Sequence, residues 1–149
     1  MISLLRTNSN DKDFKSLVES LDAELRSLDG DDHVFYGQLN KTDDVDCVIA
    51  YIDNSAVGCG AIRKFSDESM EIKRMYTREE IRGKGVATAI VADLENWSRE
   101  LGYSSCVLET GKRQPWAIAL YKKLGYKEIP NYGKYAGVLN SVCFEKKLA

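Results

Sequence analysis

The feature that most constrains this chain is a change of periodicity at a short glycine turn. Residues 82–87 read RGKGVA and separate two kinds of pattern. Before this turn, segments rich in small and β-branched apolar residues are bounded by turn residues, which is typical of strands. After it, apolar residues recur at helical spacing up to Leu101, and Gly102 is a natural helix end. The sequence therefore predicts a strand, a tight turn and a helix in direct succession.

The other segments of the chain alternate between the same two patterns. We expect strands at residues 2–6, 46–52, 56–65, 69–77, 105–110, 126–129 and 141–147, and helices at 11–28, 86–101 and 114–124, with a weaker short helix around 33–39. The consecutive strands between residues 46 and 77 predict an antiparallel meander. We therefore predict an α+β (mixed α/β) fold with a central, mostly antiparallel mixed β-sheet of about six to seven strands and helices on both faces.

Length and charge limit the classes of function. A chain of 149 residues suits one domain, 1–149, because single cores occupy about 100 to 150 residues. A net charge of −2 and a pI near 5.5 give no general attraction to phosphate backbones, so we expect no nucleic-acid partner. The N-terminus lacks a signal-peptide pattern, and no apolar stretch reaches about 18 residues. We therefore expect a cytoplasmic protein with no membrane partner.

The cysteines and the single histidine argue against metal and covalent chemistry. Cys47, Cys59, Cys106 and Cys143 are widely spaced among apolar residues, which indicates reduced core thiols. His33 is the only histidine, and it lies in an acidic, loop-like segment. These residues offer no recognisable zinc spacing and no convincing partner for a nucleophile. We expect no metal.

The glycine turn itself is typical of an anion site. A strand, a glycine turn and a helix N-terminus direct amide N–H groups and the helix dipole to one place. A dinucleotide fingerprint fails because Thr88 stands where Gly or Ala is needed. A P-loop fails because Arg78 and Gly85 stand where Gly and Ser or Thr are needed. A third pattern, Q/R-x-x-G-x-G/A, is satisfied by Arg82, Gly85 and Ala87.

At this turn the sequence resembles the GCN5-related N-acetyltransferase (GNAT) superfamily. The six-residue pattern is weak alone, but its surroundings also match: EIKRMYTREEIRGKGVATAIVADLENWSRELGY and ETGKRQPWAIALYKKLGYKEI are similar to the family's central strand, cofactor helix, fifth strand and A-x-x-L-Y-x-x-x-G-F/Y helix. The resemblance is strong over about residues 45–130. It implies direct transfer of an acetyl group from acetyl-CoA to an amine, without a metal.

The resemblance also implies which residues hold acetyl-CoA. The turn residues that would hold the pyrophosphate are Arg82, Gly83, Lys84, Gly85, Val86 and Ala87. Met75, Tyr76 and Thr77 would pair with the pantetheine arm, and a backbone N–H near Met75 would polarise the thioester carbonyl. Many relatives carry Asn where this chain has Gln114, a departure at an expected cofactor contact.

Two catalytic roles follow from the same resemblance. Tyr121 stands at the tyrosine of the family's Leu-Tyr pair, which can protonate the leaving thiolate. An aromatic residue at helical spacing can also be part of the core. Glu71 is the first candidate for the general base, directly or through water, and Glu109 is the alternative. A structural pairing of Glu71 with Lys73 or Arg113 stays open.

The acceptor is the least determined part. Residues 130–137, PNYGKYAG, can line a pocket, and Lys73 and Arg74 are expected on opposite faces of a strand, one of them near an acceptor carboxylate. The leading expectation is an N-acetyltransferase for a small-molecule amine or an amino acid. Alternatives are a protein or peptide N-acetyltransferase and a noncatalytic acyl-CoA-binding sensor. A homodimer is an open expectation, since dimers are common in the family.

Overall fold

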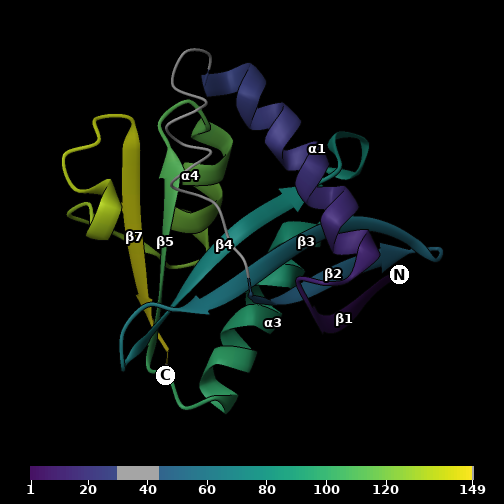
Figure 1. Ribbon diagram of the computed structural model, residues 1–149, viewed down its shortest axis with the longest axis horizontal. Helices are drawn as coiled ribbons and strands as arrows, with labels where there is room; N and C mark the ends of the chain where they lie inside the picture. Colours follow the sequence, from purple (N-terminus) through teal and green to yellow (C-terminus); the bar gives the residue numbers. More distant parts are fainter. Residues whose placement is uncertain (30–43, 149) are drawn as a thin grey trace.

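The computed structural model describes residues 1–29 and 44–148, which form a twisted sheet with helices on it (Figure 1). Its elements are β1 (Ile2–Asn8), α1 (Lys12–Asp29), β2 (Asp46–Ile52), β3 (Ser55–Lys64), β4 (Ser69–Thr77), η2 (Glu79–Ile81), α3 (Val86–Glu100), β5 (Ser105–Gly111), α4 (Pro115–Lys123), β6 (Lys127–Ile129), η3 (Gly133–Tyr135) and β7 (Ser141–Lys147). The strands and long helices expected from sequence are confirmed, with ends moved by about two residues or fewer. The short helix expected around residues 33–39 lies outside the described residues.

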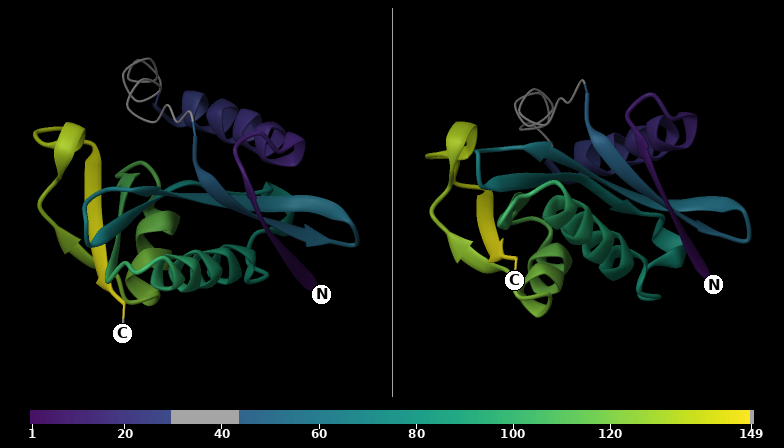
Figure 2. Two further views of the ribbon diagram at one scale, coloured as in Figure 1. Left: turned by 60° about the horizontal axis from the view of Figure 1, so that its bottom comes forward. Right: turned by 90° about the horizontal axis from the view of Figure 1, so that it is seen from below.

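The sheet has seven strands in the order β1-β2-β3-β4-β5-β7-β6. Every neighbouring pair is antiparallel except β4 and β5, which run parallel. In Figure 2, α1 covers one face of the sheet, and α3 and α4 cover the other. We call these the α1 face and the α3/α4 face. The predicted α+β fold with a mostly antiparallel mixed sheet and helices on both faces is confirmed. Among the helices of the described residues, none has the length and apolar content needed to cross a membrane.

The α3/α4 face carries the larger apolar core. Its buried side chains include Val48, Ile62, Ile72, Val86, Ile90, Leu94, Leu108, Tyr121, Tyr126 and Phe144. Two glycines of β3 let α3 approach the sheet closely: a Cβ at Gly58 would lie 2.9 Å from the Tyr76 carbonyl oxygen, and one at Gly60 would overlap the Met75 sulfur and lie 2.8 Å from Ile90. The close packing of α3 fixes where its N-terminal turn lies against β4.

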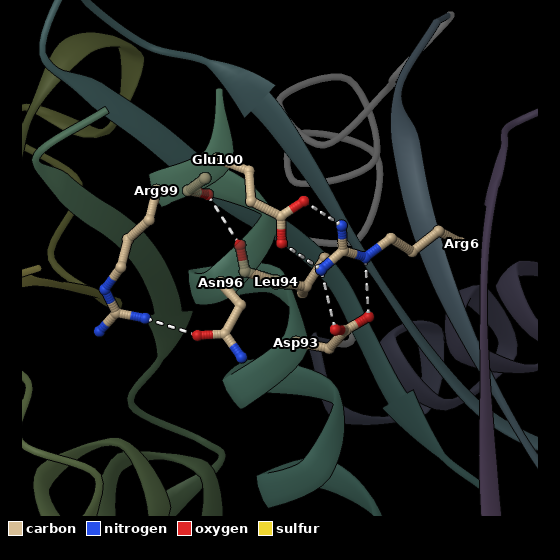
Figure 3. A network of polar contacts seen from close by, with 7 residues as sticks. Arg6, Asp93, Leu94, Asn96, Arg99 and Glu100 are labelled. Atoms are coloured by element: carbon tan, nitrogen blue, oxygen red, sulfur yellow. Dashed lines mark hydrogen bonds and ion pairs between the residues drawn. The ribbon is translucent and has the colours of Figure 1, made fainter. Parts of the chain in front are cut away.

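The edge strand β1 holds the other end of α3 through one arginine. In Figure 3, the Arg6 guanidinium lies between the carboxylates of Asp93 and Glu100 on α3. It donates to Asp93 at 3.2 and 3.0 Å and to Glu100 at 2.8 and 3.0 Å, and it lies 5.1 Å from the Trp97 ring centre. These two bidentate pairs raise the pKa of Arg6 above its ordinary value. They connect β1 to the same helix that begins directly after the glycine turn.

A β-bulge interrupts β4 at Arg74. In the pairing with β3, Tyr76 lies opposite Cys59 and Lys73 opposite Ala61, so Arg74 and Met75 share the space across from Gly60. Arg74 has a φ of +56°, which is unusual for a residue with a side chain. The expectation that Lys73 and Arg74 face opposite sides is therefore wrong. Lys73 lies over the α1-face core, and Arg74 on the same face bonds to Asp22 of α1.

The strands β4 and β5 separate beyond their first few residues. Their parallel pairing runs from Ser69 opposite Ser105 to Ile72 opposite Leu108 and then ends. Beyond this point β4 stays with β3 and β5 stays with β7, and Figure 1 shows the two strands diverging. We call this opening, after Ile72 and Leu108, the split. It leaves an edge of β4 without a strand partner in the described part of the chain.

Candidate active site

A cavity of about 520 Å³ lies at the split. Its lining comprises Leu21, Glu24 and Leu25 of α1; Ile72, Lys73, Arg74, Met75, Tyr76 and Thr77 of β4; Ile81, Arg82, Gly83, Gly85, Val86, Ala87 and Thr88 around the start of α3; Glu109 and Thr110 of β5; and Gln114, Trp116, Ala117, Leu120, Tyr121 and Lys123 at and in α4. Because helices packed on opposite faces of the sheet contribute to it, the cavity runs through the split. Lys84 and Glu71 were predicted for this site and are not among its lining residues.

The glycine turn shapes one end of the cavity. Gly83 and Gly85 have φ values of +82° and +84°, and Gly85 is the N-cap of α3. A side chain in this conformation costs roughly 1–2 kcal/mol, whereas glycine adopts it freely. A Cβ at either position would meet nothing within 4 Å, so the backbone is open to a ligand. The first amide N–H groups of α3 have no partner within the helix, and the turn can therefore bind an anion.

Arg82 is held at this end by two other elements. Its Nε donates to the Thr77 carbonyl oxygen at 3.0 Å, and its Nη2 donates to Glu24 Oε1 of α1 at 2.6 Å. The guanidinium also lies 5.8 Å from the ring centre of Tyr76. A negatively charged ligand at the glycine turn therefore competes with Glu24 for Arg82.

The edge of β4 provides backbone groups along the middle of the cavity. Met75, Tyr76 and Thr77 line it beyond the last pairing with β5. An extended, amide-containing ligand can add to such an edge through main-chain hydrogen bonds. The bulge turns Met75 toward the α3/α4 face, where it packs on the core.

Tyr121 projects from α4 into this region. The helix begins where Pro115, with its fixed φ, occupies the first helical position after Gln114. Tyr121 is 6% exposed, and its ring packs edge-on to Tyr126 with centroids 5.8 Å apart. Burial, and then the charge of Glu109, raise the pKa of Tyr121. The phenol is therefore protonated at neutral pH and lines the cavity, while its ring packs in the core; its role as proton donor stays a prediction.

Glu71 lies beside the cavity and is held by two partners. Its Oε2 accepts a hydrogen bond from the Tyr132 hydroxyl at 2.8 Å, and its Oε1 lies 3.7 Å from Lys73 Nζ. The expected pairing with Lys73 is thus present. A role for Glu71 as the base stays a prediction, because this geometry also suits a carboxylate that positions Lys73.

Glu109, the alternative base, lines the cavity at the split. Its Oε2 accepts a hydrogen bond from Ser141 Oγ of β7 at 2.7 Å. Beyond the last β4–β5 pair, Lys73 and Glu109 are the next residues of their strands, and both side chains lie on the α1 face. Glu109 and Tyr121 therefore approach the split from opposite faces.

Sequence reasoning missed several contributors to the site. Trp116 lines the cavity from the first turn of α4, and Leu21, Glu24 and Leu25 line it from α1. The segment 130–137, expected as a pocket lining, contributes no lining residue; its Tyr132 instead supports Glu71. Within residues 1–29 and 44–148, no group of His, Cys, Asp and Glu could hold a metal ion.

Comparisons with known proteins relate this arrangement to one family. The family model described as "Acetyltransferase (GNAT) family" matches residues 14–126. The protein named IAA acetyltransferase from Azospirillum brasilense is 32% identical over 135 residues, which cover 89% of this chain and 88% of that protein.

Solved structures give the same relationship. A crystal structure from Klebsiella pneumoniae, provisionally described as an acyl-CoA N-acyltransferase, is 30% identical with a TM-score of 0.85 and covers 100% of this chain and 99% of that one. A GNAT family acetyltransferase from Elizabethkingia anophelis with acetyl-CoA bound shares the fold, at 16% identity and a TM-score of 0.70 over 99% of this chain and 98% of that one.

Proposed function

Because the chain belongs to the GNAT acetyltransferase family, we propose that it transfers an acetyl group from acetyl-CoA directly to the amine of a small molecule or amino acid. The observation that carries this proposal is the single cavity that joins the left-handed glycine turn, the open edge of β4 and the buried phenol of Tyr121. The chemistry of these groups fits a donor with a pyrophosphate, an amide-bearing arm and a thioester.

Three sets of groups in the chain bind different parts of acetyl-CoA. The amides at Gly83, Gly85 and the first turn of α3, with Arg82, bind the pyrophosphate. The edge of β4 from Met75 to Thr77 pairs with the amides of the pantetheine arm. A backbone N–H near the bulge donates to the thioester carbonyl oxygen and stabilises the negative charge that develops there.

The reaction requires two proton transfers. As the amine nitrogen forms a bond to the carbonyl carbon and the carbon–sulfur bond breaks, the amine loses a proton and the thiolate gains one. Tyr121 donates its proton to the sulfur. Glu109, directly or through a water, accepts the proton of the amine, because its side chain lines the cavity at the split and that of Glu71 does not.

The test is release of coenzyme A from acetyl-CoA in the presence of a panel of free amines, amino acids and peptides, followed with a thiol reagent. The protein's own thiols at Cys47, Cys59, Cys106 and Cys143 are buried, so they add little background. We expect acceptor-dependent release with a free amine. Coenzyme A binding without release for any acceptor contradicts the proposal and indicates a noncatalytic acyl-CoA-binding protein. Release with peptides alone indicates a protein acetyltransferase.

A further inference from the structure

We propose that the acceptor carries a carboxylate, which binds to Arg74 and Lys73 on the α1 side of the split. This inference rests on the proposed function and narrows its acceptor to amino-acid-like amines. It follows from an incompletely bonded guanidinium, a buried ammonium and the position of both beside the reacting groups.

Arg74 has donor capacity that none of the described residues uses. Its side chain is 10% exposed, and its Nη1 donates to Asp22 Oδ1 at 2.9 Å. Its Nε is buried and has no hydrogen-bond partner within residues 1–29 and 44–148. Leaving a buried donor without an acceptor is costly, and a guanidinium suits a carboxylate that takes two N–H groups at once. Since Asp22 is 43% exposed, an incoming carboxylate can replace it on Arg74.

Lys73 lies in surroundings that favour a further anion. Its side chain is 4% exposed, and its nearest carboxylate oxygen, Glu71 Oε1, is 3.7 Å away. Burial lowers the pKa of Lys73, and the charges of Lys134, Arg74 and Arg63 lower it further, against the opposite effect of Glu71. A bound carboxylate would offset both the burial and the excess positive charge.

The bulge places these two cations where an acceptor must lie. It turns Arg74 onto the same face as Lys73, and both residues line the cavity. Glu109 lies across the split on that face, and Tyr121 lies on the other. A single carbon separates the amine of an α-amino acid from its carboxylate. A carboxylate on Lys73 and Arg74 therefore holds the amine at the split, beside Glu109.

The experiment compares matched acceptors at pH 7.5 with saturating acetyl-CoA. Each amino acid is assayed beside its amide, which keeps the size and removes the charge, and beside the corresponding decarboxylated amine. For at least one amino acid, we expect kcat/KM to exceed that of the amide by about 10- to 100-fold, the range of a charge-assisted hydrogen bond. Arg74→Gln and Lys73→Met should each raise KM for the acid and reduce this preference to about threefold or less.

Asp22→Asn separates a substrate site from a structural ion pair. It removes the ion pair between α1 and Arg74 and leaves the guanidinium free for a ligand. If Arg74 binds the acceptor, Asp22→Asn keeps the preference for the acid and lowers its KM. If Arg74 only holds α1, Asp22→Asn loses the preference as fully as Arg74→Gln, and this result overturns the inference. Equal use of acid and amide by the unsubstituted protein also overturns it.

Binding measurements keep the inference separate from the proposed reaction. Calorimetric titration of the coenzyme A-loaded protein with the same acids and amides reports the site without turnover. Tight binding of an acid that Arg74→Gln abolishes supports the carboxylate site, even if no acceptor releases coenzyme A and the proposed reaction fails. Turnover of decarboxylated amines with no binding of any acid supports the reaction and contradicts the site.

Discussion

Around the cavity, the α3/α4 face is held together mainly by packed apolar side chains, whereas the α1 face also carries several ion pairs. On the α3/α4 face, α3 lies tightly on Gly58 and Gly60, and Tyr121 is fixed between aromatic rings. On the α1 face, the contacts are Arg74 with Asp22, Arg82 with Glu24 and Lys73 with Glu71. Packed contacts are hard to rearrange, but an ion pair can exchange one carboxylate for another. The α3/α4 face is therefore the more rigid side of the cavity. The α1 face is the side on which a ligand's carboxylate can replace one from the protein.

Among the tests of this difference between the faces, Tyr121→Phe has the largest expected effect. If the phenol protonates the leaving sulfur, kcat should fall by about 10²- to 10⁴-fold, the usual contribution of a general acid. The ring can still pack against Tyr126 and Phe144, so affinity for coenzyme A should change less than about twofold. Steady-state kinetics and calorimetry measure the two effects.

Tyr126→Phe is the matched control on the same core. Its hydroxyl donates to Glu95 Oε2 at 2.9 Å, and Tyr126 does not line the cavity. This variant should lose stability and keep kcat. An unchanged kcat in Tyr121→Phe would mean that Tyr121 only packs.

The second test asks whether the α3/α4 face is rigid. In Gly60→Ala the new methyl group would overlap the Met75 sulfur, and we expect the free energy of unfolding to fall by about 1–3 kcal/mol. In Gly111→Ala the nearest atom, Asn140 Nδ2, would be 3.6 Å away, an ordinary contact, so the loss should be smaller. Denaturant titration compares them, and equal losses would argue against tight packing at Gly60.

The third test concerns the buried ammonium of the α1 face. Because the pKa of Lys73 is lowered from 10.5, the unfolded chain binds more protons than the folded protein between the lowered value and 10.5. The contribution of Lys73 to the free energy of unfolding should therefore rise with pH across this window, by up to about 1.4 kcal/mol per pH unit, while the buried cysteines, whose pKa values are raised, contribute in the opposite direction.

Lys73→Met should lack this rise in denaturation curves recorded between pH 7 and 10.5. Lys64→Met changes an ammonium that is 61% exposed, so its curve should run parallel to that of the unsubstituted protein. A Lys73→Met curve that also runs parallel would show that burial on the α1 face does not lower the pKa of Lys73.

The smallest expected effect comes from removing the ion pair between Glu24 of α1 and Arg82 of the glycine turn. Glu24→Gln frees Arg82 for the pyrophosphate and should tighten coenzyme A binding by about two- to fivefold, the scale of a partly exposed ion pair. Glu19→Gln makes the same charge change at an exposed position of α1 and should have less effect. Equal effects would mean that net charge, and not the contact with Arg82, governs the affinity.

Sequence alone predicted the helices, the strands and the glycine turn well, for physical reasons. Periodicity reports which face of an element is buried, and the left-handed turn required the glycines that the sequence shows at Gly83 and Gly85. The contacts on the α1 face around the cavity were predicted less well, because they join residues that are far apart in the sequence. Glu71 and Tyr132 are 61 residues apart, and nothing near either residue encodes their hydrogen bond. The bulge was missed because an arginine gives no sign of a positive φ.

The extra residue at Arg74 also changes the alternation of side chains along β4. Side chains alternate between faces with a period of two, so the bulge reverses, for all residues that follow, the face that unbroken alternation would give them. A regular pleat through all of these residues would send Met75 toward α1 and Tyr76 into the core under α3, whereas deleting Arg74 would remove the bulge and leave both on the faces they occupy now. The bulge lets the strand carry Arg74 as one more residue on the α1 face, while the sulfur that Gly60 accommodates and the ring beside Arg82 keep their positions.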